Sequence, residues 1–408
     1  MEQYTLLKAG IKKHRGVLAG IFILILLTSL SLGAVLTVWT NSRSYISSEL
    51  TRAGFGELTA WVSGVPDEAA LAAEIAGLED VARVETQNLV FSNYTANEQQ
   101  SDSEGQLILF APEEGRYRFF TDDLNGYKQD APEITPGEVV VSPSLISMMG
   151  VKIGDTIDFS IARNGGTVAL TVSGFYEDPF MGSSMIGMKG FLISEADYAA
   201  ITDTIANSGI DALARGGSML HVFQTADSEV TTAELNGILN ETTDLPNYTE
   251  FVHSADAITG FMLILQNAFS GLLIAFVVIL LAVVLIVLGH SITGAIEADT
   301  VNMGILKTAG FTSTKLRQIQ LMQAAAAILP GMLIGIALTG PLSRLVGSMA
   351  LTTTGIRIPV SIPWGLCLGT FAAVLLLLTA FVILKTAKIG RISPMKAIRG
   401  DAQGVSFR

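Results

Sequence analysis

The sequence predicts a membrane protein with four transmembrane helices and one large α+β domain between the first two of them. Half of the 408 residues are hydrophobic and only 15% are charged, a composition typical of membrane proteins. Four segments contain no Asp, Glu, Lys or Arg, and each exceeds the roughly 20 residues that cross a bilayer. These segments are residues 16–42, 257–296, 318–343 and 358–384. The long stretch between the first two is polar and has both helix and strand signals.

These patterns divide the chain into consecutive parts. They are an amphipathic segment (1–15), the first span (16–40), an external domain (41–257) with a β-rich part at about 135–195, the second span (258–289), a polar island (290–317), the third span (318–343), a short external loop (344–362), the fourth span (363–384) and a tail (385–408). The first span is too long for a signal-peptide core and lacks a small-residue cleavage pattern, so we expect it to remain as an anchor.

Charge placement predicts the orientation. The amphipathic segment, the island and the tail together carry 13 Lys and Arg residues against four acids. By the positive-inside rule, both termini and the island lie in the cytoplasm. The external domain carries 10 Lys and Arg residues against 33 Asp and Glu residues over residues 41–256. Trp39 and Trp364 agree with this topology, because both fall at the outer ends of their spans, where indole rings favour the interface.

The external domain reads as an α/β part interrupted by a β-rich insertion. A helix is expected over residues 66–78 and another over 230–239, with flanking strands at 81–91, 220–224 and 248–252. Short β-rich runs separated by turns indicate a small barrel or sandwich, and they cover residues 138–141, 156–161, 167–175 and 190–193. The loop at residues 180–190 (FMGSSMIGMKG) is expected to expose three methionines, as a surface for apolar ligands or simply as a hairpin tip or packing surface.

Pairs of glycines four residues apart occur in three of the spans. Small residues at this spacing let helix backbones approach closely, which favours a packed bundle over isolated anchors. The pairs are Gly16 and Gly20, Gly331 and Gly335, and Gly365 and Gly369.

The polar island predicts two short helical pieces that meet at an angle. Val301, Ile305 and Ala309 share one helix face, and Gly310 is placed to end that helix in the left-handed conformation. Thr312 is placed to cap a second helix, with Phe311 packing on Leu316 as a hydrophobic staple. From this pattern alone the island is either an ordinary connector or a specialised element.

No catalytic or metal-binding pattern stands out. The sequence has no HExxH or GxSxG motif, no GxxxxGK[ST] loop for ATP and no Cys/His cluster. The lone Cys367 excludes an internal disulfide and is expected to be a small buried residue. The charge-free spans argue against a secondary transporter or channel with ionisable groups along a pathway. We therefore expect no enzyme activity and no cofactor in this chain, and any ATP is bound elsewhere.

The order of parts and several local phrases resemble the FtsX/MacB-like (type VII) family of ABC-transporter permeases. The phrases are MGILKTAGFTSTKLRQI at Met303–Ile319, ISPMKAIR at Ile392–Arg399 and the β-rich GEVVVSPSLISMMGVKIGDTIDFSI at Gly137–Ile161. This chain has Gln323 where the family often has a Glu early in the third span. The resemblance implies a porter-like α/β external domain with a β-rich insertion, in a multi-pass protein of a bacterial cell membrane.

The resemblance also implies a function as a permease subunit. Cytoplasmic ABC ATPase subunits would bind ATP and Mg²⁺, two permeases would pair, and the island would be the coupling helix. Its ATPase-coupling residues would be Glu297, Val301, Gly304, Ile305, Lys307, Gly310, Phe311 and Leu316. We expect efflux or extraction of an amphiphile such as an antimicrobial peptide, a lipid-linked molecule or a drug.

The alternative is mechanotransmission, in which the chain moves no substrate and regulates an external cell-wall hydrolase or a sensor kinase. A plain adhesion or receptor anchor is disfavoured, because one span would serve. The sequence leaves open the substrate or regulated partner, a homodimer or a heterodimer with a paralogous permease, an adaptor or sensor partner, and a Gram-positive or Gram-negative host. Nucleic acid is not expected as a partner, whereas membrane lipids are.

Overall fold

The structure, a computed structural model, describes residues 2–391 and divides into two compact units. One unit, here called the helical unit, comprises Met1–Thr40, Ala268–Leu345 and the chain from Val360 onward. The other, here called the sheet domain, comprises Asn41–Asn267 and Val346–Pro359. The chain therefore enters the sheet domain twice, and the second entry comes from the segment between the third and fourth apolar helices.

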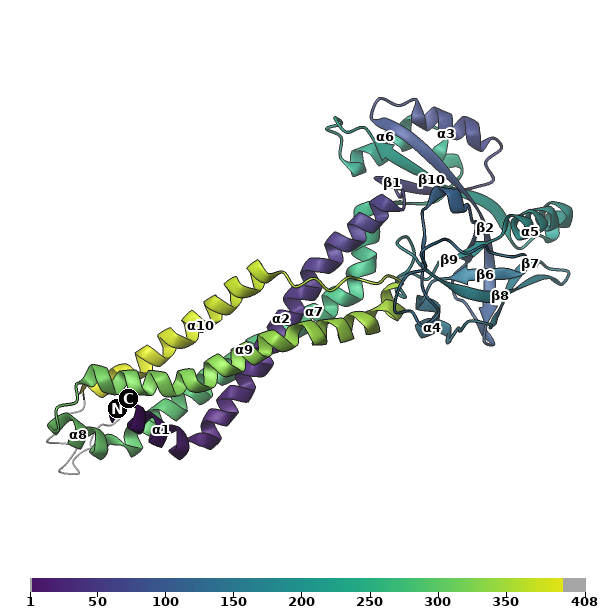
Figure 1. The fold of residues 1–408 in the computed structure, drawn as a ribbon. Coiled ribbons are helices and arrows are strands. Elements are labelled where there is room, and N and C mark those ends of the chain that lie inside the picture. The colour runs from purple at the N-terminus through teal and green to yellow at the C-terminus, as the bar shows by residue number, and fades with distance from the viewer. Residues whose placement is uncertain (1, 392–408) are drawn as a thin grey trace. The chain divides into compact units, whose positions relative to one another are not determined.

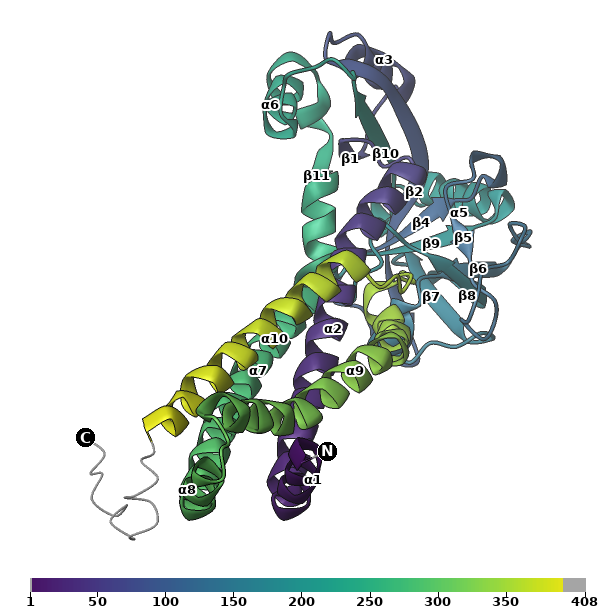
Figure 2. The same ribbon diagram turned by 60° about the vertical axis from the view of Figure 1, so that its left-hand side comes forward.

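The helical unit is built from long helices and two short ones, α1 and α8 (Figure 1). Its elements are α1 (Glu2–Lys13), α2 (Arg15–Arg52), α7 (Ala255–Ala298), α8 (Thr300–Thr308), α9 (Ser313–Thr354), α10 (Trp364–Thr386) and the 3₁₀ turn η4 (Ala387–Arg391). The two short helices, α1 and α8, lie at the same end of this unit (Figure 2).

Within the described residues, four helices are long and apolar enough to cross a membrane: Arg15–Arg52, Gln266–Ala298, Ser313–Ser348 and Trp364–Gly390. Three of the helices extend beyond the spans expected from the sequence. The 38-residue α2 is about 57 Å long, whereas a bilayer core is about 30 Å thick. The ends of α2, α7 and α9 beyond the apolar stretches belong to the sheet domain.

The core of the helical unit is a single hydrophobic cluster contributed by all the long helices. Ile21 and Ile25 of α2 are buried in it with Ile328 of α9, Leu288 of α7 and Leu378 of α10. This cluster also includes Met303 of α8 and Leu316 at the start of α9. The short helix α8 is therefore fixed to the bundle by one face.

The sheet domain contains the strands and the remaining helices. The strands are β1 (Leu58–Ser63), β2 (Val81–Ala96), β3 (Gln99–Gln100), β4 (Gly105–Leu109), β5 (Arg118–Phe119), β6 (Glu138–Val141), β7 (Thr156–Ala162), β8 (Gly166–Glu177), β9 (Lys189–Ile193), β10 (Arg215–Gln224) and β11 (Thr249–Ser254). The helices are α3 (Glu68–Ala76), α4 (Ser144–Met149), α5 (Glu195–Ser208) and α6 (Thr232–Thr242), with 3₁₀ turns η1 (Pro112–Glu114), η2 (Gly209–Asp211) and η3 (Leu245–Asn247).

The α/β part of the sheet domain is an antiparallel sheet in the order β11-β1-β10-β2, with α3 and α6 packed against it (Figure 1). Each helix starts at a capping residue. The side chain of Asp67 accepts from the amide of Ala70, and Thr231 and Glu234 form a capping box. Leucines and isoleucines of both helices then pack on β1 and β10.

The β-rich part is a closed barrel in which each strand pairs with the next in the order β2-β4-β9-β6-β8-β7 and back to β2. The 16-residue strand β2 belongs to both parts, because its first half pairs with β10 and its last four residues pair with β7. One continuous strand thus joins the two parts of the domain.

The predicted fold class, a four-helix membrane protein with a large mixed α/β domain between the first two spans, is confirmed. Two details differ from the expected boundaries. The barrel uses β4, which lies outside the β-rich stretch at 135–195, and α9 continues as helix to Thr354 inside the expected loop at 344–362. The family-like phrase Ile392–Arg399 lies outside the described residues.

Candidate coupling sites

The junction between α8 and α9 has the geometry that its sequence predicts. Gly310 has a φ of +96°, and the amide of Phe311 donates back to the carbonyl of Leu306 at 2.9 Å. These features end α8 in a left-handed glycine cap. The side chain of Thr312 then accepts from the amide of Lys315 at 3.3 Å and caps α9. Phe311 and Leu316 belong to one hydrophobic cluster, as a staple requires.

The outer face of α8 exposes two aliphatic side chains. Val301 is 49% exposed and Ile305 is 51% exposed, one helical turn apart, whereas Met303 and Gly304 on the opposite face are buried. Glu297, at the end of α7, is also exposed. Val301 and Ile305 are therefore two exposed aliphatic side chains on one face of a short helix whose other face is buried.

Lys307 is turned inward and ties α8 to the chain after α10. Its amine donates to the carbonyl of Ile389 at 2.8 Å, and burial and the nearby Arg317 lower the pKa of this amine. Arg317 in turn donates to the carbonyl of Ala387 at 2.9 Å. Among the predicted coupling residues, the structure therefore brings Gly304, Lys307, Phe311 and Leu316 to the inner side, and Glu297, Val301, Ile305 and Gly310 to the surface.

The glycine pairs of the spans differ in what they face. A Cβ on Gly331 would lie 2.7 Å from the carbonyl oxygen of Phe22, and one on Gly335 would lie 2.8 Å from that of Leu26. This pair therefore lets α9 approach the backbone of α2 closely. The other four, Gly16, Gly20, Gly365 and Gly369, have no described atom within 4 Å of such a Cβ, so their role in helix packing stays a prediction.

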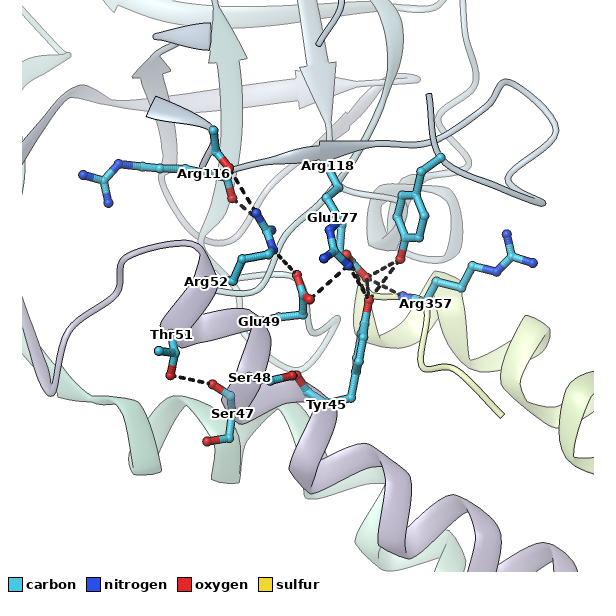
Figure 3. Close-up of polar contacts among 12 residues, drawn as sticks. Tyr45, Ser47, Ser48, Glu49, Thr51, Arg52, Arg116, Arg118, Glu177 and Arg357 are labelled. Carbon is cyan, nitrogen blue, oxygen red and sulfur yellow. Dashed lines mark hydrogen bonds and ion pairs between the residues drawn. The ribbon is translucent and has the colours of Figure 1, made fainter. Parts of the chain in front are cut away.

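In the sheet domain, the end of α2 carries a polar strip that sequence reasoning missed. Tyr45, Glu49 and Arg52 follow one another at four- and three-residue spacing and so share one helix face (Figure 3). Glu49 is buried and pairs with Arg52 at 2.6 Å and with Arg118 of β5 at 3.0 Å. This strip joins α2 to β5 through the buried Glu49 carboxylate and two partly exposed arginines.

Glu177, the last residue of β8, is a further partner of this α2 strip. Its side chain is fully buried, and its Oε1 accepts from the hydroxyl of Tyr127 at 2.7 Å, the hydroxyl of Tyr45 at 3.1 Å and the amide of Arg357 at 2.9 Å (Figure 3). Burial raises the pKa of this carboxyl above its ordinary value. Three segments that are far apart in sequence therefore meet at one carboxylate.

Two arginines tie the end of α2 to the segment before β5. Arg116 donates to the carbonyls of Ala53 and Gly54, both at 3.1 Å, and so satisfies carbonyls just beyond the last turn of α2. Arg52 donates to the carbonyls of Gly115 and Arg116, at 3.0 and 3.1 Å. Each arginine thus donates to backbone carbonyls at or next to the other arginine. Arg116 also forms an ion pair with Glu85 at 2.7 Å.

The end of α9 is fixed to the sheet domain by backbone contacts. The amide of Ser184 donates to the carbonyl of Thr353 at 2.7 Å, and the amide of Asp178 donates to the carbonyl of Gly355 at 3.2 Å. Gly355 has a φ of +70°, and a Cβ there would lie 2.6 Å from the Cα of Gly182. Only glycine fits such an approach at such a φ.

The loop that receives α9 is held from within by a buried lysine. The amine of Lys189 donates to the carbonyls of Met181, Ser183 and Ile186 at 2.8, 2.6 and 2.5 Å, and burial lowers its pKa to about 8. The expectation that this loop exposes three methionines is wrong for Met181, which is buried, while Met185 is exposed. Hydrogen bonds from Lys189 thus hold the loop that contacts the end of α9.

The sequence contained a signal for the α2 strip, because polar residues at helical spacing follow directly after the apolar stretch. The sequence contained no such signal for Glu177, Arg116 or Arg357, because their roles depend on contacts between segments that are distant in sequence. Within residues 2–391, no group of three or more His, Cys, Asp and Glu side chains is placed to hold a metal ion.

Residues 272–394 match the family model described as the FtsX-like permease C-terminal domain. This part of the chain, here called the permease domain, is similar to the C-terminal domain of that family. The resemblance to FtsX/MacB-like permeases is thereby confirmed, and the permease domain contains α8, the α8–α9 junction and the end of α9 that binds the sheet domain. No curated protein sequence matches the chain.

Two solved structures are similar to part of the chain. One is the periplasmic region of MacB from Actinobacillus actinomycetemcomitans, at 14% identity and a TM-score of 0.26, covering 51% of this chain and 92% of that one. The other is the extracellular domain of the noncanonic ABC-type transporter YknZ from Gram-positive bacteria, at 13% identity and a TM-score of 0.24, covering 48% of this chain and 98% of that one.

Proposed function

We propose that this chain is the permease subunit of an ABC transporter complex. Separate cytoplasmic ATPase subunits bind ATP and Mg²⁺ and dock on α8, and the chain passes the resulting movement to its sheet domain. The cargo is an amphiphile such as an antimicrobial peptide, a lipid-linked molecule or a drug. A second permease, identical or paralogous, completes the complex, and both termini lie in the cytoplasm.

The exposed pair Val301 and Ile305 is the observation that carries this proposal. The pair belongs to the FtsX-like permease domain, and α8 is held rigidly behind it by Met303, by Lys307 and by the capped junction at Gly310. A helix that presents two aliphatic side chains from a fixed base is suited to receive a push from a docked protein. The sequence has no GxxxxGK[ST] loop, so the nucleotide site belongs to a partner chain.

The structure offers two routes from this docking surface to the sheet domain. The first is α9, a single 42-residue helix that starts at the α8–α9 junction and ends in the loop held by Lys189. The second is α2, whose polar strip binds Glu177 and Arg118. Because these contacts are buried and numerous, a shift of either helix moves the barrel rather than sliding past it.

The same routes serve a second candidate function, the regulation of an external cell-wall hydrolase or a sensor kinase without transport. The charge-free apolar segments favour it, because the spans contain no Asp, Glu, Lys or Arg to line a polar conduit. The two candidates differ in what contacts the sheet domain, and the coupling contacts are common to both.

The test is co-purification of the full chain with candidate ABC ATPases, comparing Val301→Asp with Asn302→Asp. Both variants add one carboxylate to the first turn of α8, but only Val301→Asp removes an exposed aliphatic side chain. We expect Val301→Asp to weaken ATPase binding at least about tenfold, the effect of losing a central apolar contact, and Asn302→Asp to retain it.

If no ATPase binds the wild-type chain, or if both variants bind equally well, the proposal fails. Once a complex is isolated, stimulation of ATP hydrolysis by an amphiphilic peptide or lipid supports transport. Stimulation by a cell-wall hydrolase or sensor kinase alone supports the regulatory candidate.

A further inference from the structure

A cavity of about 430 Å³ lies in the helical unit between α1, α8 and α9. Its walls are mainly aliphatic, and they include Leu6 and Ala9 of α1, Leu306 of α8, and Leu316 and Ile319 of α9. Its polar groups are the amides of Asn302, Gln320 and Gln323 and the ion pair between Lys13 and Asp299, which is 2.6 Å long. An apolar pocket of this size with a few polar groups has the character of a small-molecule site.

The helix α1 is held over this cavity by contacts near its C-terminal end. Gly10 approaches Gln323 so closely that a Cβ on Gly10 would lie 2.8 Å from the Gln323 Cδ. Lys13, which is three residues after Gly10, forms an ion pair with Asp299. Leu6, Leu7 and Ile11 remain only half-buried. Leu6 and Ala9 of α1 line a hollow that no described side chain fills.

The position of the cavity along the chain places it at a membrane boundary. α1 ends at Lys13, and the first helix able to cross a membrane begins at Arg15. Gln320 and Gln323 lie in the first turns of the third such helix, Ser313–Ser348. The cavity is thus at the level where lipid head groups meet acyl chains.

Charge at the rim selects the kind of amphiphile. Of the basic residues on and just after α1, Lys13 lines the cavity, and its side chain is 52% exposed although it is paired with Asp299. Basic residues at a membrane surface attract anionic lipids. The volume suits one acyl chain and is too small for both chains of a phospholipid.

We propose that this cavity binds one acyl chain of an anionic phospholipid from the adjoining leaflet, with the lipid phosphate beside Lys13. The bound chain fills the space beneath α1 and makes the packing of α1 on α8 depend on the lipid. The proposal does not depend on an ATPase, and the lipid is measured with the full chain alone.

The test uses the full chain in nanodiscs and spin-labelled phosphatidylglycerol, phosphatidylcholine and free fatty acid, with the immobilised fraction of each measured by electron paramagnetic resonance. We expect Ala9→Phe, which fills the cavity, to reduce immobilised phosphatidylglycerol severalfold, and Ala9→Ser, which leaves the volume open, to retain it. Lys13→Gln is expected to lower the preference for phosphatidylglycerol over phosphatidylcholine by about fivefold, the effect of one basic residue at a membrane surface.

Lys8→Gln is the matched control, because it removes one charge from the same helix without touching the cavity. Equal immobilisation in Ala9→Phe and Ala9→Ser would overturn the proposal, and so would equal effects of the two lysine variants. Preferential immobilisation of the free fatty acid would contradict the phospholipid source. Circular dichroism of each variant confirms that the helical content is unchanged.

Discussion

The α8 end of the helical unit and the sheet-domain end of α2 are built on opposite principles. At α8, the aliphatic side chains Val301 and Ile305 are exposed, and what anchors the helix is a glycine cap and one apolar cluster. At the end of α2, Glu49, Glu177 and Arg116 are buried, and each has several partners within the chain. One end therefore exposes apolar side chains to its surroundings, while the charged groups at the other end are paired within the chain.

This difference has energetic consequences. Buried charged groups stabilise a specific arrangement only while all their partners are present, so removal of one partner is costly. Exposed apolar side chains contribute little to the stability of the isolated chain. Substitutions at the sheet-domain end should therefore lower stability, while substitutions on the outer face of α8 should change binding and leave stability unchanged.

The largest effect is expected from Arg116→Met. The substitution removes the groups that satisfy the carbonyls of Ala53 and Gly54 and leaves Glu85 with one partner fewer. We expect the sheet domain to lose about 3–5 kcal/mol of unfolding free energy. Arg83→Met is the control, because Arg83 also pairs with Glu85 but is 57% exposed, so its loss is expected to cost less than about 1 kcal/mol. Thermal unfolding of both variants measures the difference, and equal losses would remove the distinction between the two arginines.

The next effect concerns the fixed end of α9. Gly355→Ala places a Cβ 2.6 Å from the Cα of Gly182 at a residue with a φ of +70°, and we expect a loss of about 2–4 kcal/mol from strain and overpacking together. Gly64→Ala is the matched control, because Gly64 has a φ of +66° and nothing within 4 Å of an added Cβ. It should cost only about 1 kcal/mol. A Gly355→Ala variant as stable as Gly64→Ala would show that the close approach is dispensable.

A smaller loss is expected from Tyr45→Phe. This substitution removes one of the three donors to Glu177 and leaves the aromatic ring in place, so the cost is about 1.5–3 kcal/mol for a hydrogen bond to a charged group. In a complex with the ATPase, the same variant should retain ATPase binding and lose part of the response of hydrolysis to the cargo. Chemical denaturation gives the first quantity, and cargo-stimulated hydrolysis gives the second. Full stability together with full stimulation would mean that the strip transmits nothing.

The smallest effect depends on pH and concerns His221, which is fully buried in the sheet domain. The hydroxyl of Thr59 donates its proton to the carbonyl of Phe55 at 2.6 Å. The Nδ1 of His221 lies 2.8 Å from the Thr59 Oγ1, and because that hydroxyl proton is already used, Nδ1 must carry a proton and donate it to Oγ1. Burial lowers the pKa of His221 to about 3. Below pH of about 6.5 the unfolded chain gains a proton that the folded chain does not accept. The His221 contribution to stability is therefore complete above that pH and is lost as the pH falls toward 3.

We expect this contribution to fall by about 1.4 kcal/mol between pH 7.5 and pH 5.5. The measurement compares the pH dependence of thermal unfolding in the wild type and in His221→Phe, where the titration is absent. Parallel curves for the two proteins would contradict the assigned protonation state.

The sequence predicted the α8 end better than the sheet-domain end, for a physical reason. A glycine cap, a threonine cap and a staple are local, and their residues lie within a few positions of one another, as at Gly310, Thr312 and Leu316. The contacts of Glu177 join residues as distant as Tyr45 and Arg357, and no periodic pattern encodes them. The helix α9 also continued past its apolar stretch to Thr354, because contacts with the sheet domain stabilise its last turns.

The barrel shows the same limit. The short β-rich runs at β6, β7, β8 and β9 were predicted, but β4 completes the barrel from outside that stretch by pairing with β2 and β9. Likewise, the sequence could not predict that Lys307 points inward, because its hydrogen-bond partner is the carbonyl of Ile389, 82 residues later in the chain.

The central claim is that movement enters at α8 and leaves through the sheet domain. The most direct measurement is the distance between a spin label on the barrel and one at the start of α10, in nanodiscs with the ATPase bound, without nucleotide and with ATP and vanadate. The account predicts a shifted distance distribution on nucleotide binding in the wild type and no shift in Ile305→Asp. An unchanged distribution in a wild type that hydrolyses ATP, or a full shift in Ile305→Asp, would contradict it.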